Sequence, residues 1–590
     1  MIGGGDSLPL RARGAIGDTG TMALVAADGT IDWWCPGRFD APAALCKLLD
    51  ADGGAVRVGP SGEPRAGDQT YDRGTNVLRT RLPAGEGELE VVDFMPWDGS
   101  DRPSGRIVRV VTALRGRVDV DIDVQPGANF GPARDVHTFS QGIVFDGVAV
   151  HTGCDMEGRS GRLRLEAGDR AVVVLGEVGE RNRVEGLSVA AALDLLDRTA
   201  TAWRSHLSPL TYAGPYSDDV ERSLLVLKGL TYGPTGTIVA AATTSLPEVV
   251  GGERNWDYRY SWVRDASLAI DATYDAGLTE EAEVFNEWLL RLLGSATLPL
   301  HPVYDVDGRP LDPAGEVELA LDGWRGSGPV RIGNGAADHL QLDFYADLVS
   351  SIHVEQFRRD DSRVAELWSP LSRMADWLST AWRSPDRGIW ELRSKPRHLV
   401  SSKLACWSAL DRMVELARSR NPLDLDALRW REATKDIKAW LDANALAPDG
   451  GLRADDSGGN LPDGSLVQIA WRNPWPGDDR VVDATIDRMI EQLGRGPFLH
   501  RYTDELDDGF APGEGAFLAC SFWTVEALAQ RGRWEEAHER MEALCAFGGP
   551  LKLLPEQADP LTGDFLGNLP QAFSHLTFIQ AALALARGPA

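Results

Sequence analysis

Two glutamates, Glu391 and Glu556, stand in segments suited to a catalytic cleft. Glu391 ends the run Gly-Ile-Trp-Glu and Glu556 lies in Leu-Pro-Glu-Gln, so neither belongs to a charged helix face. Two carboxyl groups can cleave a glycosidic bond, one as general acid and the other as general base. Because the chain contains 88 acidic residues, accidental pairs are numerous. The surrounding sequence must therefore decide whether this pair is catalytic.

An aromatic segment at residues 255–265 could hold the sugar. Trp256 and Trp262 can stack on the apolar face of a pyranose ring. Arg264 and Asp265 are adjacent at the expected start of a helix, so they can offer donors and an acceptor to neighbouring hydroxyls. The alternative is a structural helix start in which Asp265 stabilises the first turn.

The elements that must position these residues fall into two parts. Roughly the first 200 residues contain short β-branched stretches, and residues 118–124 alternate strictly between apolar and acidic. Turn pairs such as Asp28-Gly29 separate them, which predicts an antiparallel β-sandwich. A helix over about 188–206 should leave this part, with 207–216 as a linker.

From about residue 217 the apolar period becomes helical. Thr279-Glu280-Glu281 predicts a capped helix start, and Gly294 predicts its end. Twelve helices are expected, at about 217–231, 264–277, 279–294, 336–357, 360–382, 400–417, 424–442, 464–471, 479–493, 515–531, 533–546 and 572–587. They suit a ring of six helical hairpins. The alternatives are an irregular α-domain or a solenoid, but the chain has no repeat of fixed period that would favour a solenoid.

Several long motifs occur in one order along the chain. Residues 251–265 read GGERNWDYRYSWVRD, 329–343 read PVRIGNGAADHLQLD and 566–575 read LGNLPQAFSH. Together with DGTIDWWCPGRFDAP at 28–42, these segments resemble glycoside hydrolase family 15, which contains glucoamylases, glucodextranases and certain bacterial trehalases. The resemblance spans nearly the whole chain.

This resemblance implies a fold and a set of site residues. The fold would be an N-terminal antiparallel β-sandwich over 1–206, including a linker helix, followed by an (α/α)6 barrel over 217–590 with an inverting active site at its mouth. Glu391 would be the general acid and Glu556 the general base, about 6.5–9.5 Å apart to admit water. The substrate-binding residues would be Arg264, Asp265, Tyr258, Trp262, Arg501, Trp390 and Trp407.

The local sequence gives further expectations for the two carboxyl groups. Apolar neighbours should bury Glu391 and keep it protonated, whereas Glu556, flanked by Gln557, should be better hydrated and ionised. A structural alternative for Glu391 is an ion pair with Arg393, Arg387 or Arg397.

Three segments depart from the family pattern. Several relatives have two consecutive acids where this chain has Glu556-Gln557, so only the first position is a candidate base. The tract 464–476 could reshape the outer substrate site. Residues 401–403 read Ser-Ser-Lys, where relatives often have a histidine before Ser-Lys. These departures leave the specificity for the leaving group open.

Charge and composition narrow the partners. A net charge of −28 disfavours nucleic acid and anionic membranes. The chain has no long apolar run, its start does not resemble a secretory signal, and its six cysteines suggest free thiols in a reducing cytoplasm. No cofactor or metal motif is found, and Asp478-Asp479 and Asp507-Asp508 are interpreted as surface loops rather than a cation site.

The sequence therefore predicts a cytoplasmic, inverting, exo-acting α-glucoside hydrolase that releases glucose from the nonreducing end of an α-glucan or oligosaccharide, as a glucoamylase does. The alternative is a trehalase, which needs a leaving-group site for one more glucose. A glycoside phosphorylase and a non-catalytic glycan-binding protein are disfavoured by the presence of both glutamates. Linkage, substrate length and oligomeric state, including a homo-oligomer, stay open.

Overall fold

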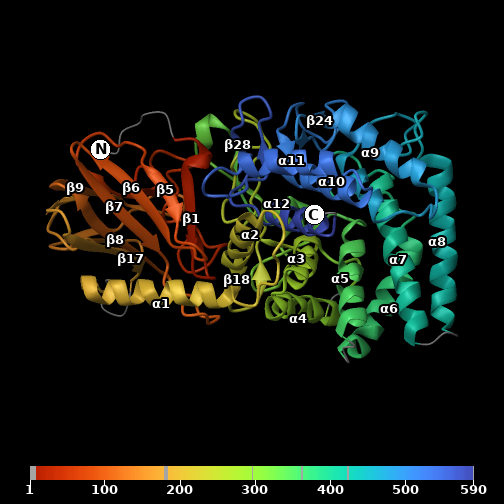
Figure 1. The fold of residues 1–590 in the computed structure, drawn as a ribbon, viewed down its shortest axis with the longest axis horizontal. Coiled ribbons are helices and arrows are strands. Elements are labelled where there is room, and N and C mark those ends of the chain that lie inside the picture. The colour runs from red at the N-terminus through yellow and green to blue at the C-terminus, as the bar shows by residue number, and fades with distance from the viewer. Residues whose placement is uncertain (1–7, 179–183, 296, 360–362, 421–423, 589–590) are drawn as a thin grey trace.

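The computed structural model describes residues 8–178, 184–295, 297–359, 363–420 and 424–588. A β-sandwich occupies one end of an elongated molecule and a helical domain the other, as Figure 1 shows. No helix in these ranges is both long and apolar enough to span a bilayer.

The sandwich consists of two antiparallel sheets within the described ranges. One has the strand order β1-β2-β3-β4-β9-β16-β15 and the other β12-β13-β14-β17-β8-β7-β6-β5. The strands of the first are β1 (Arg13–Gly17), β2 (Met22–Ala26), β3 (Thr30–Trp34), β4 (Ala55–Pro60), β9 (Val118–Gln125), β15 (Met156–Glu157) and β16 (Ser160–Leu165). Those of the second are β5 (Asp68–Tyr71), β6 (Leu78–Ala84), β7 (Gly87–Phe94), β8 (Arg106–Arg115), β12 (Val136–Phe139), β13 (Gly142–Phe145), β14 (Val148–His151) and β17 (Arg170–Glu177).

Strand β9 shows why the period-two pattern gives a sheet. Its valines and isoleucine are buried between the sheets, while the alternating aspartates point outward. Asp119 and Asp121 pair there with Arg164 and Arg162 of the neighbouring β16, at 2.9 and 2.7 Å.

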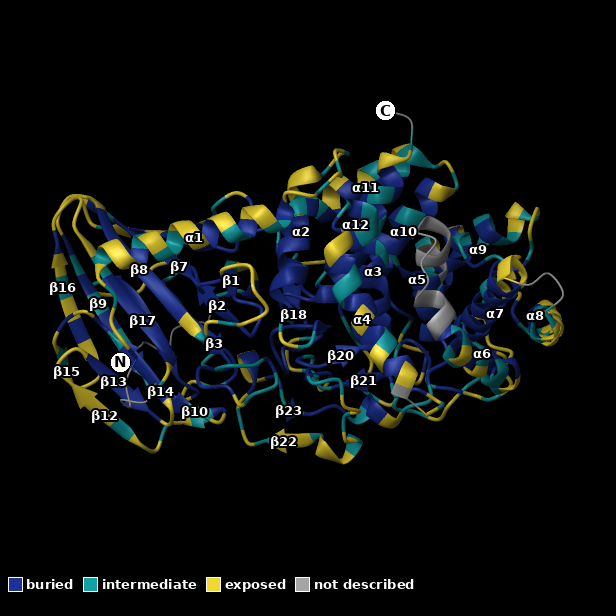
Figure 2. Cartoon of the chain, turned by 90° about the horizontal axis from the view of Figure 1, so that it is seen from below, coloured by how far each residue is buried: buried dark blue, intermediate teal, exposed yellow. Residues whose placement is uncertain are grey.

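Helix α1 (Val189–Leu207) connects the two domains. Ser188 caps its start by accepting a hydrogen bond from the amide of Ala191. One face packs on β8 and β17 and buries Ala192 and Ala200, and the other face is exposed (Figure 2). The helix therefore covers the outer face of the second sheet before the chain enters the helical domain.

The helical domain is an (α/α)6 barrel. Its inner elements are α3 (Val263–Ala276), α5 (Phe344–Arg359), α7 (Val400–Arg420), the 3-10 helix η5 (Gly464–Ala470), α10 (Leu518–Gln530) and α12 (Ala572–Ala586). Each contacts the next, and α12 contacts α3, so the ring closes. The outer elements are α2 (Ser217–Gly229), α4 (Thr279–Ser295), α6 (Arg363–Ala381), α8 (Leu425–Asn444), α9 (Asp479–Leu493) and α11 (Trp534–Phe547).

Three expected helices differ from those observed. The fourth inner element, η5, is a 3-10 helix and not an α-helix: Asp463 caps it, and Pro474 and Pro476 follow, which prevents a longer helix. Instead of a helix from 336, Asn334 caps a single turn, η4 (Gly335–Asp338), and α5 begins at residue 344.

The third difference places a predicted site residue. Residues 516–517 form the strand β26 (Ala516–Phe517) rather than the start of α10. This strand pairs with β27 (Gln557–Ala558), which in turn pairs with β28 (Phe565–Leu566). Glu556, the residue before β27, is thereby fixed at the N-terminal end of α10.

Candidate active site

Glu391 lies in the loop between α6 and α7 with a left-handed backbone, at φ +56°. Such a conformation is costly for a residue with a Cβ and is found mainly where the surrounding structure enforces it. The indole of Trp262 donates to Glu391 Oε1 at 2.7 Å, and the amide of Gln341 donates to the same oxygen at 3.1 Å. These two donors hold the carboxyl group at the N-terminal ends of α3 and α5.

Glu391 does not form the ion pair with Arg393, Arg387 or Arg397 that was the structural alternative to a catalytic role. Arg393 pairs with Glu316, Arg397 pairs with Asp455, and Arg387 donates to backbone carbonyl groups. The three arginines are thus bonded to groups other than Glu391.

Glu556 is buried, contrary to the expectation that it is the better hydrated of the two. Only 1% of the residue is exposed, whereas Glu391 is half-buried. The hydroxyl of Tyr258 donates to Glu556 Oε1 at 2.7 Å, and Oε2 has no hydrogen-bonding partner in the described residues. The neighbouring Gln557 does not hydrate this carboxyl group, because its side chain donates to Glu248 instead, at 2.9 Å.

This burial changes the titration of Glu556. Desolvation, and next the nearby charge of Glu248, raise its pKa to about 8, although Arg501 and the hydrogen bond from Tyr258 act in the opposite direction. Gly567, the residue after β28, lies beside the same carboxyl group: a Cβ added there would lie 2.5 Å from Glu556 Oε2. A side chain at position 567 would therefore displace the carboxyl group.

Arg264 and Asp265 occupy the first turn of α3. Arg264 Nε lies 3.3 Å from Asp265 Oδ1, and Arg264 Nη1 donates to the carbonyl oxygen of Ile389 at 3.3 Å. Asp265 is 2% exposed, and this burial raises its pKa to about 6 despite the guanidinium beside it. The pair therefore touches the loop that carries Glu391 and is not merely a helix cap.

Arg501 is clamped between two carboxylates, Glu248 and Glu514. Within the part of the chain that the structure describes, Glu248 accepts three hydrogen bonds, from Arg501 at 2.5 Å, from Gln557 at 2.9 Å and from the indole of Trp256 at 3.1 Å. The charge of Glu248 also raises the pKa of Glu556, so Glu248 interacts with both Arg501 and the candidate base.

Two chambers of similar size meet at Glu391. The first has an empty volume of about 420 Å³ and the second about 400 Å³. The first is lined by Glu556, Trp262, Arg264, Asp265 and Phe573, and the second by Arg254, Trp256, Arg393, Tyr502, Asp508 and Phe510. Tyr258, Trp390, Glu391 and Arg501 line both. The arrangement offers carboxyl groups, donors and aromatic faces around two adjoining spaces.

Trp407 lies apart from the other predicted site residues. Its side chain, in α7, packs half-buried against the main core and lines neither chamber. The unusual Ser401-Ser402-Lys403 run is also turned away, because Ser402 bonds to Asp386 and Lys403 to the carbonyl oxygen of Ser384. The tract 464–476 forms η5 and the loop after it, and lines neither chamber.

Several lining residues were not predicted. Arg254 pairs with Asp508 at 2.7 Å, and the hydroxyl of Tyr502 donates to the same carboxylate at 2.8 Å. Asp508 is only 5% exposed, so its assignment to a surface loop was wrong. Arg254 and Gln341 lie inside the motifs at 251–265 and 329–343, so the sequence could have indicated them as site residues. Glu248 lies before the first of these motifs, and nothing in the sequence marked it.

Comparison with known proteins agrees with this architecture. The sequence profile described as "Glycosyl hydrolases family 15" matches residues 214–543, and that described as "Trehalase-like, N-terminal" matches residues 1–154. A protein named "Trehalase" from Mycolicibacterium smegmatis is 33% identical, over 98% of this chain and 91% of its own length. A "Trehalase" from Thermoplasma acidophilum is also 33% identical, over 95% of this chain and 97% of its own.

Among solved structures, a bacterial glucoamylase crystallised with acarbose superimposes with a TM-score of 0.70. The match covers 99% of this chain and 95% of that one at 12% identity, so it bears on the fold alone. The fold, the profile matches and the full-length relatives lead to one conclusion: the chain is a glycoside hydrolase and belongs to glycosyl hydrolase family 15.

Proposed function

We propose that this enzyme hydrolyses α,α-trehalose to two molecules of glucose with inversion at the attacked carbon. The glucoamylase-like specificity placed first from the sequence becomes the second candidate. What favours trehalose is that the relatives described above align along nearly the whole chain, including the N-terminal domain, and are named trehalases.

The observation that carries the proposal is the pair of similar chambers joined at Glu391. Trehalose consists of two identical rings, and each chamber would take one of them. The first chamber would hold the ring under attack, with Arg264 and Asp265 on its hydroxyls and Trp262 at its face. The second, with its charged Arg254, Arg393 and Asp508, would hold the departing glucose through hydrogen bonds.

In the proposed reaction Glu391 is the general acid and Glu556 the general base. A water molecule between Glu556 and the sugar attacks the anomeric carbon, and Glu556 accepts its proton. The bond to the bridging oxygen breaks as Glu391 donates a proton to that oxygen. Glu556 must be ionised before it can accept this proton. Water that enters with the sugar beside the unpartnered Oε2 would hydrate the carboxylate and so favour its ionised form.

A substrate panel tests the assignment. Trehalose, maltose, isomaltose, kojibiose, nigerose and longer maltooligosaccharides would be compared by glucose release, with and without phosphate. We expect the highest kcat/KM on trehalose, no need for phosphate as a substrate, and equal amounts of α- and β-glucose in early NMR spectra. A preference for long maltooligosaccharides would favour the glucoamylase-like candidate, and glucose 1-phosphate as a product would overturn hydrolysis.

We further propose that the enzyme works in a reducing compartment, the cytoplasm. All six cysteines are free thiols and five of them are buried, as expected where disulfides do not form. Fractionation of the source cells would test this, and recovery of the enzyme outside the cytoplasm would contradict it.

A further inference from the structure

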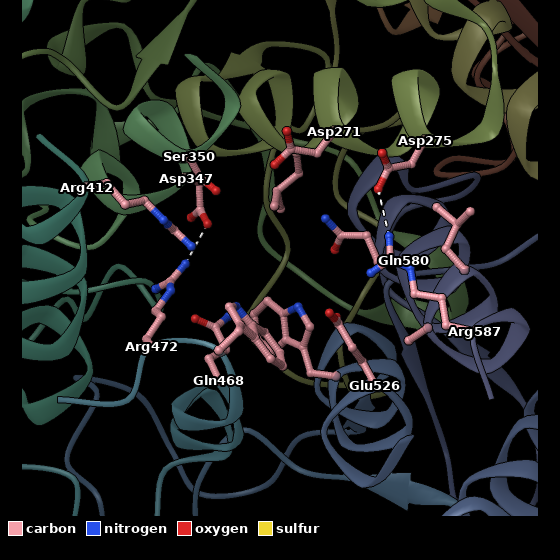
Figure 3. Close-up of a pocket in the computed structure, with 15 residues that line it drawn as sticks. Asp271, Asp275, Asp347, Ser350, Arg412, Gln468, Arg472, Glu526, Gln580 and Arg587 are labelled. Atoms are coloured by element: carbon pink, nitrogen blue, oxygen red, sulfur yellow. Dashed lines mark hydrogen bonds and ion pairs between the residues drawn. The ribbon is translucent and has the colours of Figure 1, made fainter. Parts of the chain in front are cut away.

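A second, larger cavity lies inside the barrel at the end opposite the two chambers. Its empty volume is about 960 Å³, and all six inner elements contribute to its wall. The first chamber is lined by residues at or just before the starts of α3, α10 and α12, whereas this cavity is lined from their later turns, by residues such as Asp275, Glu526 and Arg587 (Figure 3). A concave space lined by aromatic side chains and a few polar groups is the usual setting of a small-molecule site.

The wall of this cavity carries charges of both signs. The wall contains four carboxyl groups and three guanidinium groups. Two of the guanidinium groups form ion pairs, that of Arg472 with Asp347 at 2.5 Å and that of Arg587 with Asp275 at 3.1 Å. Burial raises the pKa of a third carboxyl group, that of Glu526, to about 7, so the charges nearly balance at neutral pH.

The donors on one side of the cavity are incompletely satisfied. Among the described residues Arg412 has neither an ion pair nor a hydrogen-bonding partner, although the charges of Asp271 and Asp347 act on it. The side chain of Arg472 is 6% exposed, and its Nε has no acceptor. In Figure 3 these two guanidinium groups lie close together beside Asp347. The buried Nε of Arg472 is a costly unsatisfied donor, and the half-buried Arg412 lines the cavity without a partner in the described residues, so a ligand that brings oxygen acceptors is favoured here.

The composition of the wall selects among ligand classes. An anion would add negative charge beside Asp271, Asp347 and Asp275, and an apolar molecule would leave the arginine donors unsatisfied. A neutral polyhydroxylated ring can accept from Arg412 and Arg472 and donate to the carboxylates. The indoles of Trp471 and Trp523 and the amides of Gln468 and Gln580 in the same wall suit its apolar face and its hydroxyls.

The cavity also adjoins the catalytic site. Trp523, in its wall, packs with ring centroids 5.3 Å from Phe573 and 6.4 Å from Trp390, both of which line the chambers. Leu268, also in its wall, lies one helical turn after Arg264 on α3. A ligand that shifts Trp523 would therefore act on side chains that border the substrate.

We propose that this cavity is a second carbohydrate site, which binds a neutral monosaccharide such as glucose and modulates turnover through Trp523. The site is independent of which glucoside the enzyme cleaves. Its occupant accepts hydrogen bonds from Arg412 and Arg472. The aromatic layer formed by Trp523, Phe573 and Trp390 separates it from the catalytic chambers.

Binding can be measured without any assay of turnover. Tryptophan fluorescence of the full-length protein would be titrated with glucose, and crystals would be soaked in glucose. We expect two saturable phases, one from the chambers and one from the cavity, and glucose density beside Arg412. In Arg412→Met the second phase should weaken at least tenfold. Arg418→Met, at an exposed position on the same helix, is the matched control and should behave like the wild type.

Kinetics give a second measurement. Glucose in the chambers competes with substrate and raises the apparent KM, whereas glucose in the cavity should also lower kcat. Arg412→Met should lose the effect on kcat and keep the effect on KM, and Gln580→Leu should do the same if Arg412→Met folds poorly. Identical titrations of wild type and both variants, or sulfate that binds in the cavity while glucose does not, would overturn the proposal. If the substrate panel showed no activity on trehalose, the fluorescence result for glucose in the cavity would still stand. The proposed function and the proposed second site can therefore be disproved independently.

Discussion

The two ends of the barrel differ in how fully their charged side chains are paired. At the mouth, Arg254, Arg264 and Arg501 each contact a carboxylate, and Glu391 has two donors before any ligand arrives. At the opposite end, Arg412 and the Nε of Arg472 lack acceptors among the described residues. The mouth is preorganised for chemistry, because fixed dipoles and charges need no rearrangement during the reaction. The other end is suited to a ligand that completes it.

Removal of either glutamate should have the largest effect. We expect Glu391→Gln and Glu556→Gln to lower kcat on the best substrate by roughly 10²–10⁴-fold each, because each removes a proton-transfer group. Melting temperatures would be measured beside the rates. Near-wild-type turnover in both variants would sink the assignment of the mouth as the catalytic end.

Asp343, the residue before α5, tests whether the buried polar groups of the barrel have the hydrogen-bonding partners they need. It is 2% exposed, neither carboxylate oxygen has a partner in the described residues, and burial raises its pKa from 3.8 to about 7. Because the pKa of Asp343 is higher in the folded than in the unfolded state, the free energy of unfolding falls as the pH rises above 3.8. The loss is complete above about pH 7. Asp343→Asn should therefore be as stable as the wild type near pH 4 and more stable by about 4 kcal/mol near pH 8.

Urea unfolding of both proteins across this pH range would check the prediction. Glu505→Gln, at a fully exposed carboxyl group, is the control and should show no comparable pH-dependent gain. A difference between wild type and Asp343→Asn that stays constant with pH would show that Asp343 is ionised and satisfied in the fold.

Glu248 should set the pH dependence of the mouth. The base must be ionised, so kcat/KM of the wild type should rise with pH to a midpoint near the Glu556 pKa of about 8. Because the charge of Glu248 raises that pKa, Glu248→Gln should move the rising limb to lower pH. A loss of kcat/KM at all pH values without a shift of the midpoint would make Glu248 a purely structural residue.

The smallest effect is expected at Trp407. Since it lines neither chamber, Trp407→Phe should change kcat/KM by less than about threefold, the scale of a surface or peripheral substitution. Trp390→Phe is the matched comparison, because Trp390 lines both chambers and donates to Asp463 at 2.8 Å. A larger loss at Trp407 than at Trp390 would mean that the substrate reaches α7.

The order of domains and most helices could be predicted, because apolar period and caps are local properties. The same is true of Arg264 and Asp265, which lie within one contiguous motif. The burial of Glu556 could not be predicted from Gln557 beside it, since residues near 248 and 501 enclose it through contacts far apart in sequence. Asp508 was missed for the same reason: its partner Arg254 is 254 residues away. The 3-10 geometry of η5 was missed because its apolar pattern also suits an α-helix.

The hydrogen bond from Arg264 to the carbonyl oxygen of Ile389 has a consequence for redesign. The side chain that would recognise the sugar also supports the backbone two residues before Glu391. Engineering the enzyme for a different glycoside by changing Arg264 would therefore move the acid as well as the pocket. Substitutions in the second chamber, at Arg254 or Arg393, offer a route to new specificity that leaves this support intact.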